Sequence, residues 1–326
     1  MRPTFFCLCM SPAIDALVKL PAAPRGEGEI FKDVADVENA GGKAINVARW
    51  LAIRGAQVAC GGLLGEDNAV PFEKALKEHG IEDRFLRVAG STRRNEMIVW
   101  PGGAFKVNRA AFPGLDHREV LGKLEALVET TIGSETTVVL SGSLPMGWPA
   151  DTYRRLVAAA KARGAVVVLD ASGEALRLGC EAQPDVVKPN AEECRPLVGF
   201  VPETADDFRR ATALLKKQVA FPIISDGGKG CWFDGEFVAA PKVEVVDTTA
   251  AGDTLLAEYC WRTFGELGEP RSVAASRDME QHSAWWAVAA GSAACTMAGS
   301  APPPPQLVER LKDQIGDAQR LAGALR

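Results

Sequence analysis

Two kinds of apolar pattern alternate along most of the chain, and together they predict strands followed by helices. Short runs rich in β-branched and aromatic residues, typical of buried strands, occupy residues 5–10, 58–64, 84–88, 137–140, 166–170, 185–187 and 222–225. Longer segments with helical spacing of apolar or small residues occupy residues 70–79, 119–131, 151–163, 205–218, 285–298 and 306–325. This alternation predicts an α/β fold in which helices cover a mostly parallel sheet.

Residues 17–40 depart from this alternation. Glycines and prolines there separate short β-like pieces at residues 29–32 and 34–37, which predicts a small sheet outside the α/β core. No internal repeat and no low-complexity linker divides the chain, and α/β folds of this length often form one unit.

Polar or glycine-rich groups follow the carboxyl ends of several predicted strands. They occupy residues 141–145, 171–173, 188–193, 226–230 and 248–253. The carboxyl ends of parallel strands meet at one edge of the sheet, and open α/β sheets bind their ligands there. These five loops therefore predict an active site at that edge.

The last of these loops has the most suggestive chemistry. A β-branched run at 243–246 leads into small residues, a carboxylate and an apolar helical pattern, which predicts a strand, a tight turn and a helix. Small residues let the main-chain N–H groups of Ala250, Ala251, Gly252 and Asp253 gather at the helix N-terminus, where an anion is favoured. A carboxylate beside an anion pocket suits phosphoryl transfer, because it can accept the proton of the attacking hydroxyl. The residues alone equally allow Asp253 to be a helix cap and Gly252 a turn residue.

Three further groups carry candidate binding residues. Asp15 follows the first predicted strand and can either cap a turn or accept hydrogen bonds from substrate hydroxyls. Gly41 and Gly42 precede a predicted helix, where they form a turn or let a ligand approach the backbone, and Asn46 offers a polyol both a donor and an acceptor. The arginine pair at residues 93–94 lies in a β pattern and suits either a bidentate phosphate contact or the charged edge of a sheet.

Charge and composition narrow the function classes. The 37 Lys and Arg and 42 Asp and Glu residues give a formal net charge of −5, so no general affinity for nucleic acid follows and an anion pocket must be local. No apolar run reaches the length of a membrane span and no cleavable signal opens the chain, so we expect no membrane partner. The eight cysteines lie mostly in apolar patterns, which favours reduced thiols in a cytoplasmic protein. The three histidines lie far apart in sequence, which argues against a histidine metal cluster.

Five motifs resemble, in order, those of the ribokinase-like carbohydrate kinases of the PfkB family. Residues 247–253 (Asp-Thr-Thr-Ala-Ala-Gly-Asp) resemble the family's D-T-x-G-A-G-D signature, and residues 41–49 resemble G-G-K-G-I-N-V-A-R. Residues 92–95, 141–145 and 188–193 resemble T-R-x-N, S-G-S-L-P and K-P-N-x-x-E. The resemblance covers nearly the whole chain and is nearest to the 1-phosphofructokinases, tagatose-6-phosphate kinases and minor 6-phosphofructokinases. Alanine stands at positions 44 and 250, where the family has glycine.

The resemblance implies a ribokinase-like three-layer αβα sandwich with a mostly parallel sheet, in a single kinase domain over residues 1–326. It also implies a small β-sheet lid from residues 12–40 and 92–110, through which two subunits form a homodimer. The implied activity is ATP-dependent phosphorylation of a ketohexose phosphate, with Mg²⁺ as cofactor. Fructose 1-phosphate is the favoured substrate, giving fructose 1,6-bisphosphate, and tagatose 6-phosphate and fructose 6-phosphate are the alternatives.

The resemblance further implies roles for individual residues. Asp253 is the implied base, and the amides of Ala250, Ala251 and Gly252 form the anion hole. The implied sugar-binding residues are Asp15, Gly41, Gly42, Lys43, Asn46, Asn95 and Ser143, and the implied ligands of the phosphate already on the sugar are Arg93, Lys43 and Lys32. The implied nucleotide-binding residues are Lys188, Asn190, Ser225, Gly227, Gly228, Gly230, Thr248 and Ala294. Asn190 and Glu193 would organise Mg²⁺ indirectly, through water.

Two other functions stay open on the sequence. The alanines at positions 44 and 250 also suit a non-catalytic sensor of sugar phosphates or nucleotides, although a sensor has no need of the carboxylate at 253. A Rossmann dehydrogenase is disfavoured, because no G-x-G-x-x-G opens a helix after the first predicted strand.

Overall fold

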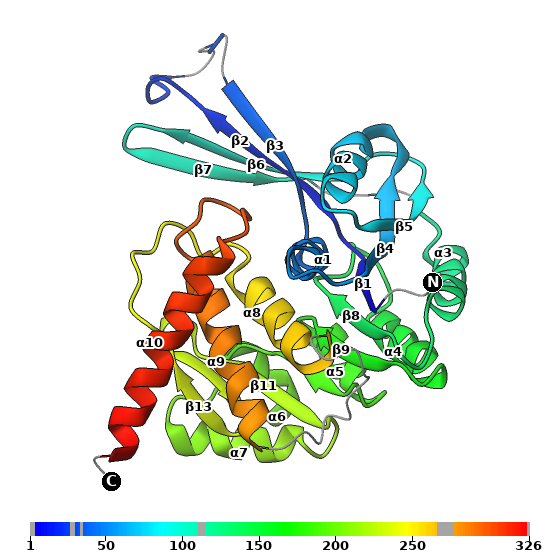
Figure 1. Ribbon diagram of the computed structural model, residues 1–326. Helices are drawn as coiled ribbons and strands as arrows, with labels where there is room; N and C mark the ends of the chain where they lie inside the picture. Colours follow the sequence, from blue (N-terminus) through cyan, green and yellow to red (C-terminus); the bar gives the residue numbers. More distant parts are fainter. Residues whose placement is uncertain are drawn as a thin grey trace.

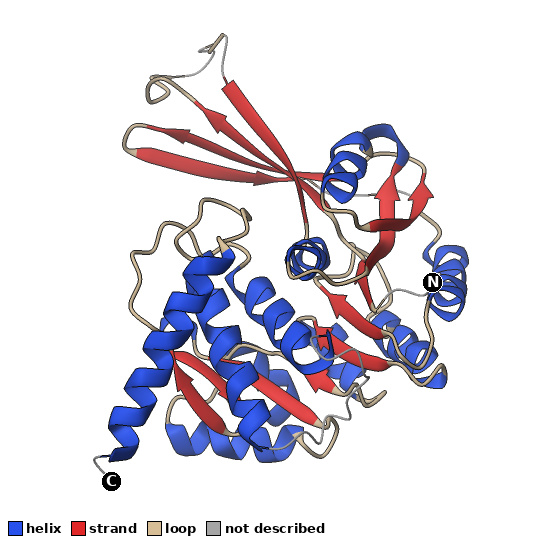
Figure 2. Cartoon of the chain, in the orientation of Figure 1, coloured by secondary structure: helices blue, strands red, loops and turns tan. Residues whose placement is uncertain are grey.

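A nine-stranded sheet forms the centre of the computed structural model, which describes residues 4–26, 30–32, 35–109, 112, 115–265 and 277–324 (Figures 1 and 2). Its strands, in the order β13-β12-β11-β10-β9-β8-β1-β4-β5, are β1 (Phe5–Cys9), β4 (Val58–Gly65), β5 (Glu82–Val88), β8 (Thr137–Ser141), β9 (Val166–Asp170), β10 (Val186–Val187), β11 (Phe221–Ser225), β12 (Gly230–Phe233) and β13 (Glu236–Ala239). The strands from β11 to β5 in this order are parallel, and β12 and β13 add an antiparallel hairpin at one edge.

Helices cover both faces of this sheet. They are α1 (Lys43–Ile53), α2 (Val70–Glu78), α3 (His117–Thr131), α4 (Thr152–Ala162), α5 (Gly173–Cys180), α6 (Arg195–Val198), α7 (Ala205–Leu215), α8 (Ala251–Cys260), α9 (Arg277–Ala294) and α10 (Pro305–Ala324). Successive side chains of a strand point to opposite faces. Phe5 and Cys7 of β1 accordingly join one core with α1, α2, α8, α9 and α10, while Phe6 and Leu8 join a second core with α3, α4, α5 and α7. The predicted α/β fold with three layers is confirmed.

A separate four-stranded sheet extends from the helices at the top of Figure 1. In the order β3-β2-β6-β7, it contains β2 (Ala13–Lys19), β3 (Ala35–Gly41), β6 (Arg93–Trp100) and β7 (Gly103–Asn108). The predicted small sheet is therefore present; of its two predicted β-like pieces, the one at 34–37 overlaps β3, and the one at 29–32 is not a strand where it is described. Residues 30–32 do not belong to a strand, and Glu29 and Val34 lie outside the described residues.

Two predictions near the carboxyl end are wrong. Residues 243–246 form no strand; Val245 and Val246 are exposed, and the N–H groups of Val246 and Asp247 both donate to the carbonyl of Cys295. Within the described residues β13 is the edge strand of the large sheet, and residues 243–246 do not pair with it. Helix α9 ends at Ala294, four residues earlier than expected.

The structure also shows the state of the cysteines and the apolar character of the helices. All eight cysteines lie within the described residues and are free, and seven of them are buried, in line with the expected reduced thiols. Across the described residues, none of the helices has the length and apolar character needed to cross a bilayer.

Candidate active site

Asp253 is a buried carboxylate in the first turn of α8. Asn46 of α1 donates from Nδ2 to Asp253 Oδ2 over 2.8 Å. Burial raises the pKa of Asp253 to about 6, and the negative charge of Asp170 raises it too, against the smaller opposing effects of Lys43, Asn46 and Lys188. The carboxylate is therefore ionised at neutral pH yet basic enough to accept a proton.

The turn before α8 contains a strained backbone position, at the place where the family has a glycine. Ala250 adopts the left-handed conformation, with φ 60° and ψ 4°. Ala251 N–H donates to the carbonyl of Thr248 over 3.3 Å, so this amide is engaged within the turn. The N–H groups of Gly252 and Asp253 lie in the first helical turn and lack carbonyl partners within the helix, so they remain candidates for the predicted anion hole. A β-carbon on Gly252 would lie 3.3 Å from Lys188 Nζ, so this glycine lets the lysine approach the turn.

Asp170, at the carboxyl end of β9, holds two lysines beside this turn. Lys188 Nζ lies 3.3 Å and Lys43 Nζ lies 3.4 Å from Asp170 Oδ1, and Ser141 Oγ donates to Oδ2 over 3.1 Å. Burial alone would raise the pKa of Asp170, but Lys188 and Lys43 lower it below its ordinary value. Burial likewise would lower the pKa of Lys43, but Asp170, Asp253 and Glu193 raise it. Two ammonium groups are thus fixed at the sheet edge.

Asp170 was missed as a functional residue in the sequence. It appears there only as the last residue of a predicted strand, ahead of a polar loop. The signal was available, because a carboxylate that closes an otherwise apolar strand must be buried with a partner or lie at a ligand-binding edge.

The small sheet brings three of the predicted sugar-binding residues onto one face. Its register pairs Ala13 with Arg93 and Asp15 with Asn95, and residues two apart along a strand share a face. Asn95 Nδ2 donates to Asp15 Oδ1 over 2.8 Å. Burial raises the pKa of Asp15, and Asn95 and Arg93 partly offset this.

The two neighbouring arginines, at positions 93 and 94, differ sharply in their partners. Arg94 lies on the opposite face of the sheet and forms ion pairs with Glu38 and Glu96. Within the described part of the chain, the hydrogen bonds of Arg93 go to two main-chain carbonyls, those of Pro12 and Ser11, each over 3.3 Å. Among the described residues no carboxylate forms an ion pair with Arg93, so its charge is available to an anion.

The predicted glycine pair joins the small sheet to α1. A β-carbon on Gly41 would lie 2.0 Å from Asp15 Oδ2, and Gly42 precedes α1 with φ 127°. The pair lets the Asp15 carboxylate lie against the start of α1, which carries Lys43 and Asn46. Ser143 and Lys32 are exposed, and no described contact joins either of them to the other predicted residues.

Some of the residues predicted to bind nucleotide or Mg²⁺ are joined by hydrogen bonds around one turn, and others are exposed. Asn190 and Glu193 bind each other reciprocally, since Asn190 N–H donates to Glu193 Oε2 over 2.9 Å and Glu193 N–H donates to Asn190 Oδ1 over 2.8 Å. Ser225 N–H donates to the carbonyl of Pro189, which places the end of β11 beside this turn. Gly227, Gly228 and Thr248 are exposed.

Gly230 and Ala294 have local structural reasons to be small. A β-carbon on Gly230 would lie 2.1 Å from the carbonyl oxygen of Val238, so the hairpin of β12 and β13 requires this glycine. Ala294 is buried at the end of α9. No group of three His, Cys, Asp or Glu side chains within the described residues could hold a metal ion directly.

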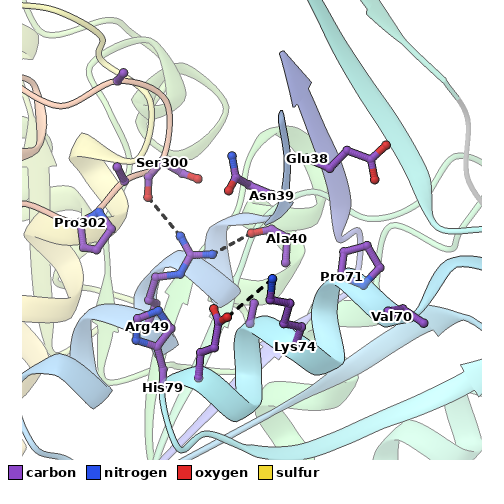
Figure 3. A pocket seen from close by; sticks show the side chains of 14 residues that line it. Glu38, Asn39, Ala40, Arg49, Val70, Pro71, Lys74, His79, Ser300 and Pro302 are labelled. Carbon is purple, nitrogen blue, oxygen red and sulfur yellow. Dashed lines mark hydrogen bonds and ion pairs between the residues drawn. The ribbon is translucent and has the colours of Figure 1, made fainter. Parts of the chain in front are cut away.

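A separate hollow of about 510 Å³ lies where β3, α1, α2 and residues 298–302 meet (Figure 3). None of the predicted site residues lines it. Arg49 connects its walls, because Nη1 donates to the carbonyl of Ser300 over 3.1 Å and Nη2 donates to that of Ala40 over 2.8 Å. The guanidinium thus ties the base of the small sheet to the loop after α9.

A buried carboxylate with a pKa near 6, two lysines and a helix N-terminus meet at the carboxyl edge of a parallel sheet, an arrangement suited to a phosphoryl-transfer enzyme. The model of the pfkB family carbohydrate kinases matches residues 12–259, and the chain belongs to this family.

Known relatives give the type of sugar kinase. A 1-phosphofructokinase of Vibrio cholerae is 37% identical over 229 residues, which cover 68% of this chain and 72% of that protein. A 1-phosphofructokinase of Escherichia coli is 34% identical over 260 residues, covering 76% and 80%. The comparisons support a phosphofructokinase-type sugar kinase.

Solved structures agree on the fold. Phosphofructokinase-2 from Escherichia coli in complex with potassium superimposes with a TM-score of 0.82 at 23% identity, covering 97% of this chain and 100% of that one. Ribokinase from Giardia lamblia superimposes with a TM-score of 0.70 at 18% identity, covering 94% and 98%.

Proposed function

We propose that the protein transfers the γ-phosphoryl group of ATP to fructose 1-phosphate and forms fructose 1,6-bisphosphate. The observation that carries this proposal is the buried Asp253 carboxylate, which is held by Asn46 beside Lys43 and Lys188. Relatives named 1-phosphofructokinase at 34–37% identity support the choice of sugar.

Asp253 would remove the proton of the attacking sugar hydroxyl. Because its pKa is about 6, roughly nine-tenths of the carboxyl groups are ionised at pH 7. Asn46 Nδ2 donates to one carboxylate oxygen, which leaves the other for the substrate. Lys43, half-exposed and paired with Asp170, lies close enough to stabilise charge on the reacting groups.

Arg93 would bind the phosphate already on the sugar. Among the described residues its guanidinium donates to two carbonyl groups at 3.3 Å, so it keeps donors for a planar, bidentate contact. Asp15 and Asn95 lie on the same face of the small sheet and offer an acceptor and a donor to the sugar hydroxyls.

The donor side would use the first turn of α8. The free N–H groups there and the Lys188 ammonium group suit the γ-phosphoryl oxygens. The side chains at Asn190 and Glu193 fit Mg²⁺ held through water, because one Glu193 oxygen is engaged by Asn190 N–H while the other is left for a hydration shell. When bound, Mg²⁺ would neutralise charge on the phosphates.

The test is turnover on a panel of sugars with coupled detection of ADP. We expect kcat/KM for fructose 1-phosphate to exceed that for fructose 6-phosphate, tagatose 6-phosphate and ribose. Higher activity on one of the other phosphosugars would reassign the substrate within the same mechanism, and equal activity on ribose would refute the phosphate-binding role of Arg93. Binding without turnover of any sugar would favour a sensor.

The small sheet also supports a homodimer. The register places Phe105 and Val107 of β7 on the face that carries Arg94, opposite the face with Asp15. Phe105 is 46% and Val107 is 38% exposed, and an apolar strip on a thin sheet is stabilised by a covering partner. Sedimentation of the wild type as a dimer and of Phe105→Asp as a monomer is the expected result, and a monomeric wild type would contradict it.

A further inference from the structure

A second buried carboxylate joins the same two helices as the Asn46–Asp253 contact. Glu258 of α8 is fully buried. Trp50 Nε1, on α1, donates to Glu258 Oε2 over 2.8 Å. Arg54 Nε lies 3.3 Å from the same oxygen, and Arg262 Nε donates to Oε1 over 2.9 Å. These partners account for both oxygens of a carboxylate that burial alone would strongly disfavour.

Helices α1 and α8 therefore meet through two polar links. Asn46 and Trp50 are four residues apart on α1, so they lie on one face of it, about 6 Å apart along the helix axis. Both helices also contribute buried apolar side chains, including Val47 of α1 and Leu256 of α8, to one core. Apolar contacts have little directional preference, whereas a hydrogen bond to a buried carboxylate fixes how one helix lies on the other.

We propose that Glu258, acting through Trp50, is a positioning residue for the active site: it fixes α1 on α8 so that Asn46 stays hydrogen bonded to Asp253. The proposal rests on the proposed function only for its kinetic consequences. The Asn46–Asp253 contact itself can be followed without turnover.

Loss of this contact has a defined signature. The charged groups that face Asp253 come from three elements: Asp170 at the end of β9, Lys43 of α1 and Lys188 after β10. The Asn46 amide favours the ionised carboxylate, so its withdrawal raises the pKa of Asp253. A purely structural loss of packing elsewhere would not move this titration.

Trp50→Phe removes the indole N–H and keeps an aromatic ring, and Trp232→Phe is its matched control. Trp232 is also buried, in the second core and stacked on Phe208, and its Nε1 has no hydrogen-bond partner within the described structure. The readouts are the carboxyl ¹³C titration of Asp253 by NMR and the acid limb of kcat. For Trp50→Phe we expect both to shift to higher pH by about half a unit or more. We also expect kcat to fall by a larger factor than any change in the KM for ATP. For Trp232→Phe we expect neither to shift.

A double-mutant cycle tests whether Trp50 acts through Asn46. In an Asn46→Ala background, Trp50→Phe should add no further shift to the Asp253 titration. An unshifted titration in Trp50→Phe, or an undiminished further shift in the Asn46→Ala background, would overturn the proposal. Glu258→Met, which keeps the length of the side chain and removes both acceptor oxygens, serves if Trp50→Phe does not fold, with the same shift expected and an unshifted titration again overturning the proposal. An NMR shift without a change in the acid limb of kcat would leave the positioning intact and refute Asp253 as the base.

Discussion

Replacement of Asp253 by asparagine separates the chemistry of this carboxylate from its shape. The two side chains have nearly the same size, and the asparagine carboxamide oxygen can still accept the hydrogen bond from Asn46 Nδ2 that the carboxylate accepts in the wild type. Lys43 and Lys188 keep Asp170 as their partner. The variant should therefore fold and bind ATP with little change.

Turnover should fall steeply in Asp253→Asn. A positioned general base contributes about a hundredfold to ten-thousandfold to a rate, and kcat should drop by that factor. The assay is coupled ADP detection at saturating sugar phosphate, with ATP affinity measured separately by calorimetry. A variant that keeps more than about a tenth of wild-type kcat would refute the assignment of the base.

The same variant should gain stability above pH 6. The pKa of Asp253 rises from 3.8 to about 6 in the folded protein, so the folded state holds the proton more tightly than the unfolded chain does. The wild type consequently loses stability as the pH rises from about 4 to 6, by about 3 kcal/mol in all. Denaturant unfolding of Asp253→Asn and wild type should give similar free energies near pH 4 and a more stable variant at pH 7. If the difference in free energy of unfolding between variant and wild type does not change with pH, burial does not destabilise the ionised form of this carboxylate.

Three other substitutions have defined outcomes. Arg93→Ala should raise the KM for phosphorylated sugars by more than about tenfold and leave the KM for ATP unchanged. Arg94→Ala, on the opposite face, is the control and should alter neither KM. Equal effects of the two substitutions would contradict the phosphate-binding role of Arg93. Ala250→Gly should raise the free energy of unfolding by about 1 kcal/mol, because glycine adopts the φ of 60° at this position without strain. Its kcat should stay within about twofold of wild type, and a destabilised variant would contradict the reasoning. Gly41→Ala should raise the KM for the sugar, because the new methyl group would lie 2.0 Å from a carboxylate oxygen of β2, and Gly26→Ala, with open space around it, is the control that should have no effect.

The sequence predicted the layers of the fold well because both faces of the large sheet are covered. Buried parallel strands then read as continuous apolar runs, and the helices between them show regular spacing. The prediction failed where this logic does not apply. The run 243–246 has strand-like residues, but strand formation needs backbone pairing, and among the described strands none pairs with it. The missed hairpin of β12 and β13 turns at Asp234-Gly235, a dipeptide that favours such turns and was visible in the sequence.

The candidate site was predicted in part, for reasons that differ between its residues. Asp253 and Asn46 lie 207 positions apart in the chain, and no local pattern indicates that they are hydrogen bonded. Their motifs placed both of them at the site, but the contact depends on how α1 packs on α8. Which of the two neighbouring arginines lies on the face with Asp15 likewise depends on strand register, because register decides the face of each side chain.

The two alanines that stand in place of family glycines have different structural consequences, and the difference favours an enzyme over a sensor. Ala44 lies inside α1 with ordinary helical geometry, so its methyl group causes no backbone strain. Ala250 keeps the left-handed conformation despite its methyl group, and its carbonyl accepts from both the N–H and the hydroxyl of Thr254 over 2.9 Å. The turn therefore retains the geometry that a glycine would give and presents the next amides and Asp253 in the same way. A chain released from catalysis has no reason to maintain about 1 kcal/mol of strain beside a buried carboxylate.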